Sequence, residues 1–181
     1  GAMGYGLPSA IGACFANQRA PMVLVESDGS FQLNIQEMAT ISYHKLPICL
    51  ILINNKGYAS IRNTQRSYFE SRYIGTGPEA GLKLPNMRKV ASTYNIPFLK
   101  ISKSKELNLK LKTAIKSSWP LLVEVDVMPN ETLFPKVSAI PQADGSMISM
   151  PLEDMSPLLS LEEIESEMIV KLSKTSYKAR K

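Results

Sequence analysis

The sequence contains few of the side chains that bind transition metals or form a nucleophile and base pair. Its 181 residues include two cysteines and one histidine, His44. Cys14 and Cys49 each lie in an apolar run, and neither belongs to a Cys-x-x-Cys pair. These features argue against a zinc site and against a Cys/His catalytic pair. Both cysteines are predicted to be buried and reduced.

A long apolar segment is lacking as well. No run approaches the roughly 18 apolar residues that a membrane-spanning helix needs, and the N-terminal residues do not resemble a signal peptide. The sequence is therefore typical of a cytoplasmic protein without a membrane partner.

The formal net charge of +5 raises the question of a nucleic-acid partner. The excess is concentrated at the C-terminal end, where no acidic residue follows Met168 and the basic residues are Lys171, Lys174, Lys178, Arg180 and Lys181. Because the rest of the chain is close to neutral, we expect a solvated C-terminal end and predict no nucleic-acid partner.

Apolar segments that alternate with helical patterns predict an α/β domain. Buried strands are predicted at residues 22–26, 48–53, 97–101 and 121–127. Helical spacing predicts helices near residues 8–18, 34–44, 58–66, 87–94 and 107–115. Asn34 and Glu37 are predicted to form a capping box at the start of the second of these helices. The expected fold is a doubly wound, mostly parallel sheet with helices on both faces.

The chain is predicted to divide into one domain, residues 1–128, and an extension, residues 129–181. Repeated prolines in the extension favour an irregular path, which could serve as a lid or pack against a partner domain. One amphipathic helix is predicted within it, from about Ser160 to Leu172.

Polar clusters follow the first two predicted strands. Asp28-Gly29-Ser30 ends the first strand, and residues 54–57, Asn-Asn-Lys-Gly, end the second. Consecutive strands of such a sheet usually lie side by side, so both clusters are expected at one edge, where ligands bind in this class of fold. Carboxylate, amide and backbone carbonyl oxygens suit Mg²⁺, and a glycine allows close approach of a phosphate. Either cluster alone is a common turn; together they favour a metal-bridged diphosphate.

The two clusters, at this spacing, resemble the diphosphate-binding motif of thiamine diphosphate enzymes, in which Gly-Asp-Gly is followed by Asn-Asn. Ser27 stands where that motif has its first glycine. The segment at residues 1–12, the triplet Gln-Glu-Met at 36–38 and the pair Phe-Pro at 134–135 also resemble acetolactate synthases and their decarboxylase relatives.

The resemblance implies thiamine diphosphate and Mg²⁺ as cofactors. It implies metal ligation by the side chains of Asp28 and Asn55 and by the backbone carbonyl of Gly57. The residues it implies for cofactor binding are Gly1, Met3, Asp28, Gly29, Ser30, Asn55 and Tyr58. Among these, the Gly1 carbonyl and Met3 would hold the pyrimidine end of the cofactor in its bent form.

The resemblance also implies what this chain does not contain. The glutamate that activates the cofactor belongs, in this family, to a pyrimidine-binding domain or second subunit, so no catalytic residue is expected in this chain. The implied enzyme is a homo-oligomer, a dimer or tetramer, that acts as a carboligase or decarboxylase on a small 2-oxo acid such as pyruvate.

The acceptor substrate is left open by the sequence. Ile61, Thr64 and Gln65 are candidate pocket residues, but Thr64 stands where acetolactate synthases tend to have tryptophan. Arg62 could bind a carboxylate or lie on the surface.

Three other functions are alternatives. They are a simple 2-oxo acid decarboxylase, a non-catalytic or regulatory subunit that keeps the fold, and a dinucleotide-binding domain. The last is the weakest, because residues 4–9 lack the third glycine of the dinucleotide motif and a strand before it.

Overall fold

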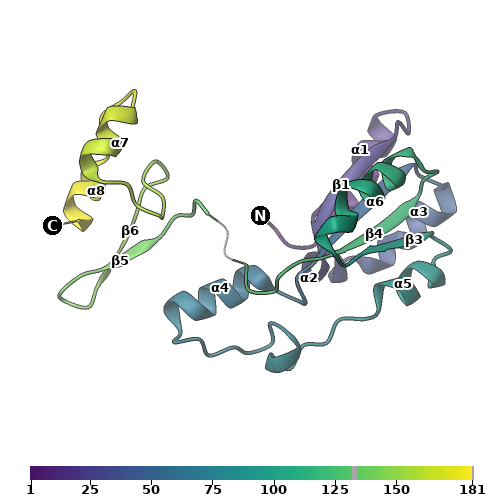
Figure 1. Ribbon diagram of the computed structural model, residues 1–181, viewed down its shortest axis with the longest axis horizontal. Helices are drawn as coiled ribbons and strands as arrows, with labels where there is room; N and C mark the ends of the chain where they lie inside the picture. Colours follow the sequence, from purple (N-terminus) through teal and green to yellow (C-terminus); the bar gives the residue numbers. More distant parts are fainter. Residues whose placement is uncertain (132–133, 181) are drawn as a thin grey trace. The chain divides into compact units, whose positions relative to one another are not determined.

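The computed structural model describes residues 1–131 and 134–180 of the chain (Figure 1). Lys181, one of the basic residues at the C-terminal end, lies outside the described part. The chain forms two compact units, Gly1–Glu131 and Thr132–Lys181.

The first unit is built on a sheet of four parallel strands. These are β1 (Met22–Ser27), β2 (Ile48–Asn54), β3 (Phe98–Ile101) and β4 (Leu121–Asp126), in the order β1-β2-β4-β3. The register pairs Ser27 of β1 with Ile53 of β2, so these two strands end at the same edge of the sheet. The adjacency expected from the sequence is confirmed.

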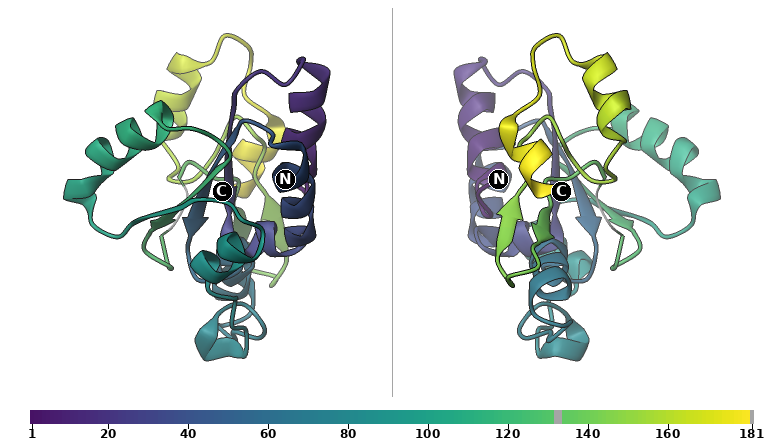
Figure 2. Two further views of the ribbon diagram at one scale, coloured as in Figure 1. Left: turned by 90° about the vertical axis from the view of Figure 1, so that its right-hand side faces the viewer. Right: turned by 90° about the vertical axis from the view of Figure 1, so that its left-hand side faces the viewer.

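Helices cover both faces of this sheet, as the burial of consecutive residues in β2 requires. The helices of the first unit are α1 (Gly6–Ala16), α2 (Asp28–Gln32), η1 (Ile35–Glu37), α3 (Met38–His44), α4 (Ala59–Tyr68), η2 (Pro78–Ala80), α5 (Met87–Thr93) and α6 (Ser104–Lys116). Leu50 and Leu52 of β2 pack in one core with residues of α1, α3 and α5, whereas Cys49 packs in a second core with α6. Figure 2 shows α1 and α6 on opposite sides of the sheet. The doubly wound α/β fold is thus confirmed.

Both cysteines are free and buried, as predicted from their apolar surroundings. Burial raises the pKa of the Cys49 thiol. Within the described residues, no helix is long and apolar enough to cross a membrane.

The predicted capping box at Asn34 and Glu37 is wrong. Asn34 precedes η1, but its side chain makes no capping hydrogen bond there. Its Nδ2 donates instead to the carbonyl oxygen of Gly4, at 2.5 Å, and the Glu37 carboxylate accepts from the Thr40 hydroxyl. The tertiary contact with the N-terminal loop has replaced the local cap.

The second unit contains more regular structure than its prolines suggested. A short hairpin pairs β5 (Ala139–Pro141) with β6 (Met147–Ser149), and two helices follow, α7 (Leu161–Glu167) and α8 (Lys174–Ala179). Ser160 and Glu163 form a capping box at the start of α7.

The predicted helix from Ser160 to Leu172 is too long. The backbone becomes extended at Met168, and the chain then buries Leu172 and caps α8 with the Ser173 side chain. The apolar residues keep a helical spacing across Met168, although the helix itself ends at Glu167.

Candidate functional site

The two polar loops meet where β1 and β2 end. Asp28 begins α2 directly after β1, and its Oδ2 accepts a hydrogen bond of 3.0 Å from the backbone N–H of Gly57, beyond β2. Its Oδ1 accepts a second bond, of 2.9 Å, from the N–H of Gly29. The structure therefore brings the two predicted clusters into direct contact.

Asp28 is a buried carboxylate, with 1% of its surface exposed. Burial raises the pKa of Asp28, and the backbone N–H groups of Gly57 and Gly29 oppose that rise. Burial disfavours a negative charge unless donors or a cation compensate it. The charged form of Asp28 is thus only partly compensated by the protein itself.

Two polar groups converge beside this carboxylate. One end of the Asn55 side-chain amide lies 3.1 Å from Asp28 Oδ1 and 2.7 Å from the carbonyl oxygen of Gly57, both of them acceptors. With its nitrogen on that side, the amide donates to both acceptors. Turned over, it places a third oxygen beside them. In octahedral Mg²⁺ sites the ligands lie about 2.1 Å from the ion, so neighbouring oxygens are about 3 Å apart. The donor set and its spacing fit Mg²⁺.

Few other side chains of the types that bind metals lie near Asp28. Over residues 1–131 and 134–180, no group of three or more His, Cys, Asp or Glu side chains lies close enough to hold a metal ion. A cation at this edge would depend on one carboxylate, one amide and backbone or ligand oxygens.

Gly29 is required by the close packing of the two loops. A Cβ at this position would lie 2.7 Å from the carbonyl oxygen of Gly57 and 2.6 Å from Cδ1 of Tyr58. The Tyr58 ring therefore covers the turn that begins with Asp28, and only glycine leaves room for it.

Ser30 ties the N-terminal loop to this turn. Its hydroxyl accepts from the N–H of Gly4, at 2.9 Å, and donates to Glu26 Oε1, at 2.7 Å. Gly1 and Met3 are exposed, and the loop that carries them is fixed at Gly4. The predicted residues of the pyrimidine end thus lie on a loop anchored to the predicted diphosphate turn.

Glu26 supports the predicted turn through Ser30, and sequence reasoning did not single it out. Its side chain is 8% exposed, and its Oε2 has no hydrogen-bond partner among the described residues. An acidic residue inside an apolar strand segment was the available signal.

The candidate pocket residues of α4 make other contacts. The Thr64 hydroxyl donates to the Ser60 carbonyl, and the Gln65 side chain bonds to the backbone of Ile74. Ile61 is half-buried. These three residues line neither of the two cavities near the loops, whose volumes are about 280 Å³ and about 160 Å³.

A polar network beneath the second loop was also missed. Nδ2 of Asn54 donates to Glu124, at 2.5 Å, and to Asp126, at 3.2 Å, and Lys100 forms ion pairs with both acids. Asn54 Oδ1 in turn accepts from the N–H of Lys56. The first asparagine of the pair thus joins the loop to β4.

An open parallel sheet with hard oxygen donors and a tightly packed glycine at its carboxyl edge defines an α/β domain of the kind that binds phosphorylated cofactors. Comparison with known proteins identifies the family. Residues 1–125 match the family described as "Thiamine pyrophosphate enzyme, C-terminal TPP binding domain", and the chain belongs to this family.

Individual relatives are acetolactate synthases. The chain is 36% identical over 138 residues to the acetolactate synthase large subunit of Porphyra purpurea, a match that covers 76% of this chain and 23% of the relative. It is 34% identical over 138 residues to that of Cyanidium caldarium, with the same coverage. It is 32% identical over 141 residues to the chloroplastic acetolactate synthase of Arabidopsis thaliana, covering 76% of this chain and 21% of the relative. The chain thus spans about a quarter of the length of these relatives.

Proposed function

We propose that residues 1–128 bind thiamine diphosphate through Mg²⁺ held by Asp28, Asn55 and the carbonyl of Gly57. The observation that carries this proposal is the convergence of these groups, with the Asn55 amide 3.1 Å from Asp28 Oδ1 and 2.7 Å from the Gly57 oxygen. A buried carboxylate with incomplete compensation gains most from a divalent ion. Phosphate oxygens and water would complete the coordination.

The other predicted residues have parts in the same proposal. Gly29 keeps the turn after β1 open to the diphosphate, and Ser30 fixes the N-terminal loop through Gly4. Gly1 and Met3, on that loop, would contact the pyrimidine end. Tyr58 would cover the diphosphate from the start of α4.

The intact protein is proposed to be an acetolactate synthase-like carboligase or decarboxylase that acts on a small 2-oxo acid. Its relatives are named acetolactate synthases, and they are about four times as long as the region that matches this chain. Thiamine diphosphate, when bound, supplies a nucleophilic carbon and an electron sink. The residues of this chain would bind and orient it, while a pyrimidine-binding domain, in the same polypeptide or a second subunit of a dimer or tetramer, would provide the activating glutamate.

Calorimetric titration of the chain with thiamine diphosphate, with Mg²⁺ and with EDTA, tests the proposal. We expect binding that requires Mg²⁺ and no turnover of pyruvate by the chain alone. Equal affinity in EDTA would refute the role of the metal. A regulatory subunit that has lost the site would bind under neither condition. Product analysis of the full-length enzyme separates carboligation from simple decarboxylation.

A further inference from the structure

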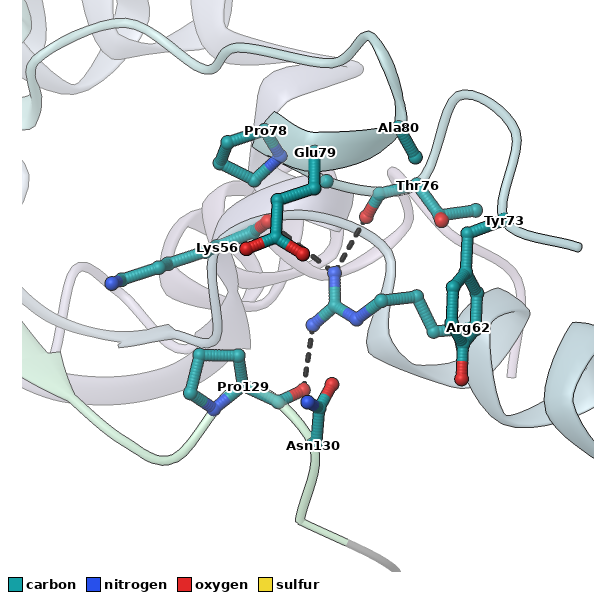
Figure 3. Close-up of a pocket in the computed structure, with 10 residues that line it drawn as sticks. Lys56, Arg62, Tyr73, Thr76, Pro78, Glu79, Ala80, Pro129 and Asn130 are labelled. Carbon is teal, nitrogen blue, oxygen red and sulfur yellow. Dashed lines mark hydrogen bonds between the residues drawn. The ribbon is translucent and has the colours of Figure 1, made fainter. Parts of the chain in front are cut away.

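Arg62 makes an unusual set of contacts for an arginine beside a candidate anion site. It lies on α4, and among the described residues its guanidinium donates to four backbone carbonyls and to no acid; Figure 3 shows the contacts with Lys56, Thr76 and Pro129. Nη2 donates to Asn55, at 2.6 Å, and to Pro129, at 2.7 Å. Nη1 donates to Thr76, at 2.5 Å, and to Lys56, at 3.3 Å. Arg62 is half-buried and lines a cavity of about 280 Å³, and its contact with a substrate carboxylate stays a prediction.

These contacts use most of what the guanidinium offers. Arginine has five N–H donors in a planar fork, and here four of them are bonded to carbonyl oxygens. The fifth, on Nε, is buried and has no partner in the part of the chain that the structure describes. The guanidinium thus bonds to backbone carbonyl oxygens, which take the place of water as its acceptors.

The carbonyls belong to three chain segments that meet at the loop after β2. Two are consecutive members of that loop, Asn55 and Lys56, and one follows β4, at Pro129. The fourth, of Thr76, also accepts from the N–H of Tyr58, at 3.0 Å. Arg62 therefore joins the loop after β2 to two other segments, one at Thr76 and one at Pro129.

The loop needs such support because its backbone is strained. Lys56 has a φ of 62° and Gly57 a φ of 126°, both in the left-handed region. A non-glycine residue there is strained and persists only where the surroundings hold it. The carbonyls of Asn55 and Lys56 face the guanidinium, whereas the carbonyl of Gly57 lies beside the Asn55 amide.

We infer that Arg62 is a positioning residue that sets the geometry, and so the Mg²⁺ affinity, of the loop formed by residues 55–57. It acts through the backbone, by holding two carbonyls away from the ion so that the third, with the Asn55 side chain, faces it. Lysine would keep the charge but, as a single ammonium group with three donors, could not span four carbonyls. The inference rests on the proposed function.

The test compares Arg62→Lys and Arg62→Met with wild type. The Mg²⁺ concentration that half-saturates thiamine diphosphate binding is measured by calorimetry at a fixed cofactor concentration. We expect it to rise about 10- to 100-fold in both variants, as for other residues that orient metal ligands. Arg66→Met is the matched control, because it removes the same charge one turn later in α4, where Arg66 bonds to Asn63, and it should stay within about twofold of wild type.

A second readout needs no cofactor. Hydrogen exchange of the Gly57 and Tyr58 amides in the cofactor-free protein should become faster in the Arg62 variants, while that of the β2 amides stays unchanged. Absence of Mg²⁺-dependent binding in wild type would refute the proposed function itself. If wild type binds and Arg62→Lys, folded by circular dichroism, has the same Mg²⁺ requirement and exchange rates, the inference about Arg62 is overturned.

Discussion

The Asp28 carboxylate and the Gly57 amide, 29 positions apart in the chain, are joined by a buried hydrogen bond of 3.0 Å. The bond connects the loops that follow two adjacent parallel strands. Because it forms between protein groups alone, the two halves of the candidate site are held together before any ligand arrives. A preorganised site of this kind spends less of its binding free energy on ordering the loops.

Asp28→Asn tests the contribution of the carboxylate. The amide is nearly isosteric, but it lacks the negative charge by which the carboxylate attracts a divalent ion. We expect the Mg²⁺ requirement for thiamine diphosphate binding to rise by at least about 100-fold, since loss of an outer-shell partner alone costs about 10- to 100-fold. Asp144→Asn, at an exposed turn, is the control for the same chemical change. Binding by Asp28→Asn with the wild-type Mg²⁺ requirement would exclude Asp28 as a ligand.

Gly29→Ala tests the packing of the two loops. The added methyl would lie 2.7 Å from the backbone oxygen of Gly57, which cannot move away without displacing its loop. We expect a loss of about 1–3 kcal/mol in the free energy of unfolding, measured with urea, together with weaker cofactor binding.

Gly12→Ala provides the opposite control. Nothing lies within 4 Å of the added methyl, and the position is inside α1. This variant should gain about 0.5–1 kcal/mol, because alanine favours the helix. Equal effects of the two substitutions would contradict the close approach at Gly29.

The contact between Asp28 and the loop of Asn55 was predictable because it depends on topology. Two consecutive apolar strands in an α/β pattern pair in parallel, and their carboxyl ends then carry whatever polar residues follow them. The contacts of Arg62 and Asn34 were not predictable in this way. Each side chain bonds to backbone carbonyls of a distant loop, and the path of that loop is set by packing, not by a periodic pattern.

Asn54→Asp should damage the network under the second loop. The Asn54 amide donates to Glu124 and Asp126, so a carboxylate in its place would put three acids together around the ion pairs of Lys100. We expect a loss of about 2–4 kcal/mol in the free energy of unfolding at neutral pH, since a buried acceptor loses its donor. The loss should shrink at acidic pH, where the added acid takes up a proton. A deficit that does not change with pH would show that charge repulsion is not the cause.

Lys100→Met tests the pH dependence of the same network. Desolvation lowers the pKa of Lys100, but the hydrogen bond with Asp126 and the charges of Glu124 and Asp126 outweigh it, so the pKa is raised above its ordinary value of 10.5. A raised pKa means that the folded state holds the proton more tightly than the unfolded state does. The stabilisation by Lys100 is therefore complete below pH 10.5 and is lost as the pH rises through the higher, folded-state value.

Because the Lys100 side chain is 39% exposed, we expect a difference of only about 1 kcal/mol between wild type and variant. Urea unfolding across the alkaline range should show a constant difference up to about pH 10 and a shrinking one above it. A difference that stays constant through the alkaline range would mean that Lys100 stabilises the fold by packing of its stem instead of by its charge.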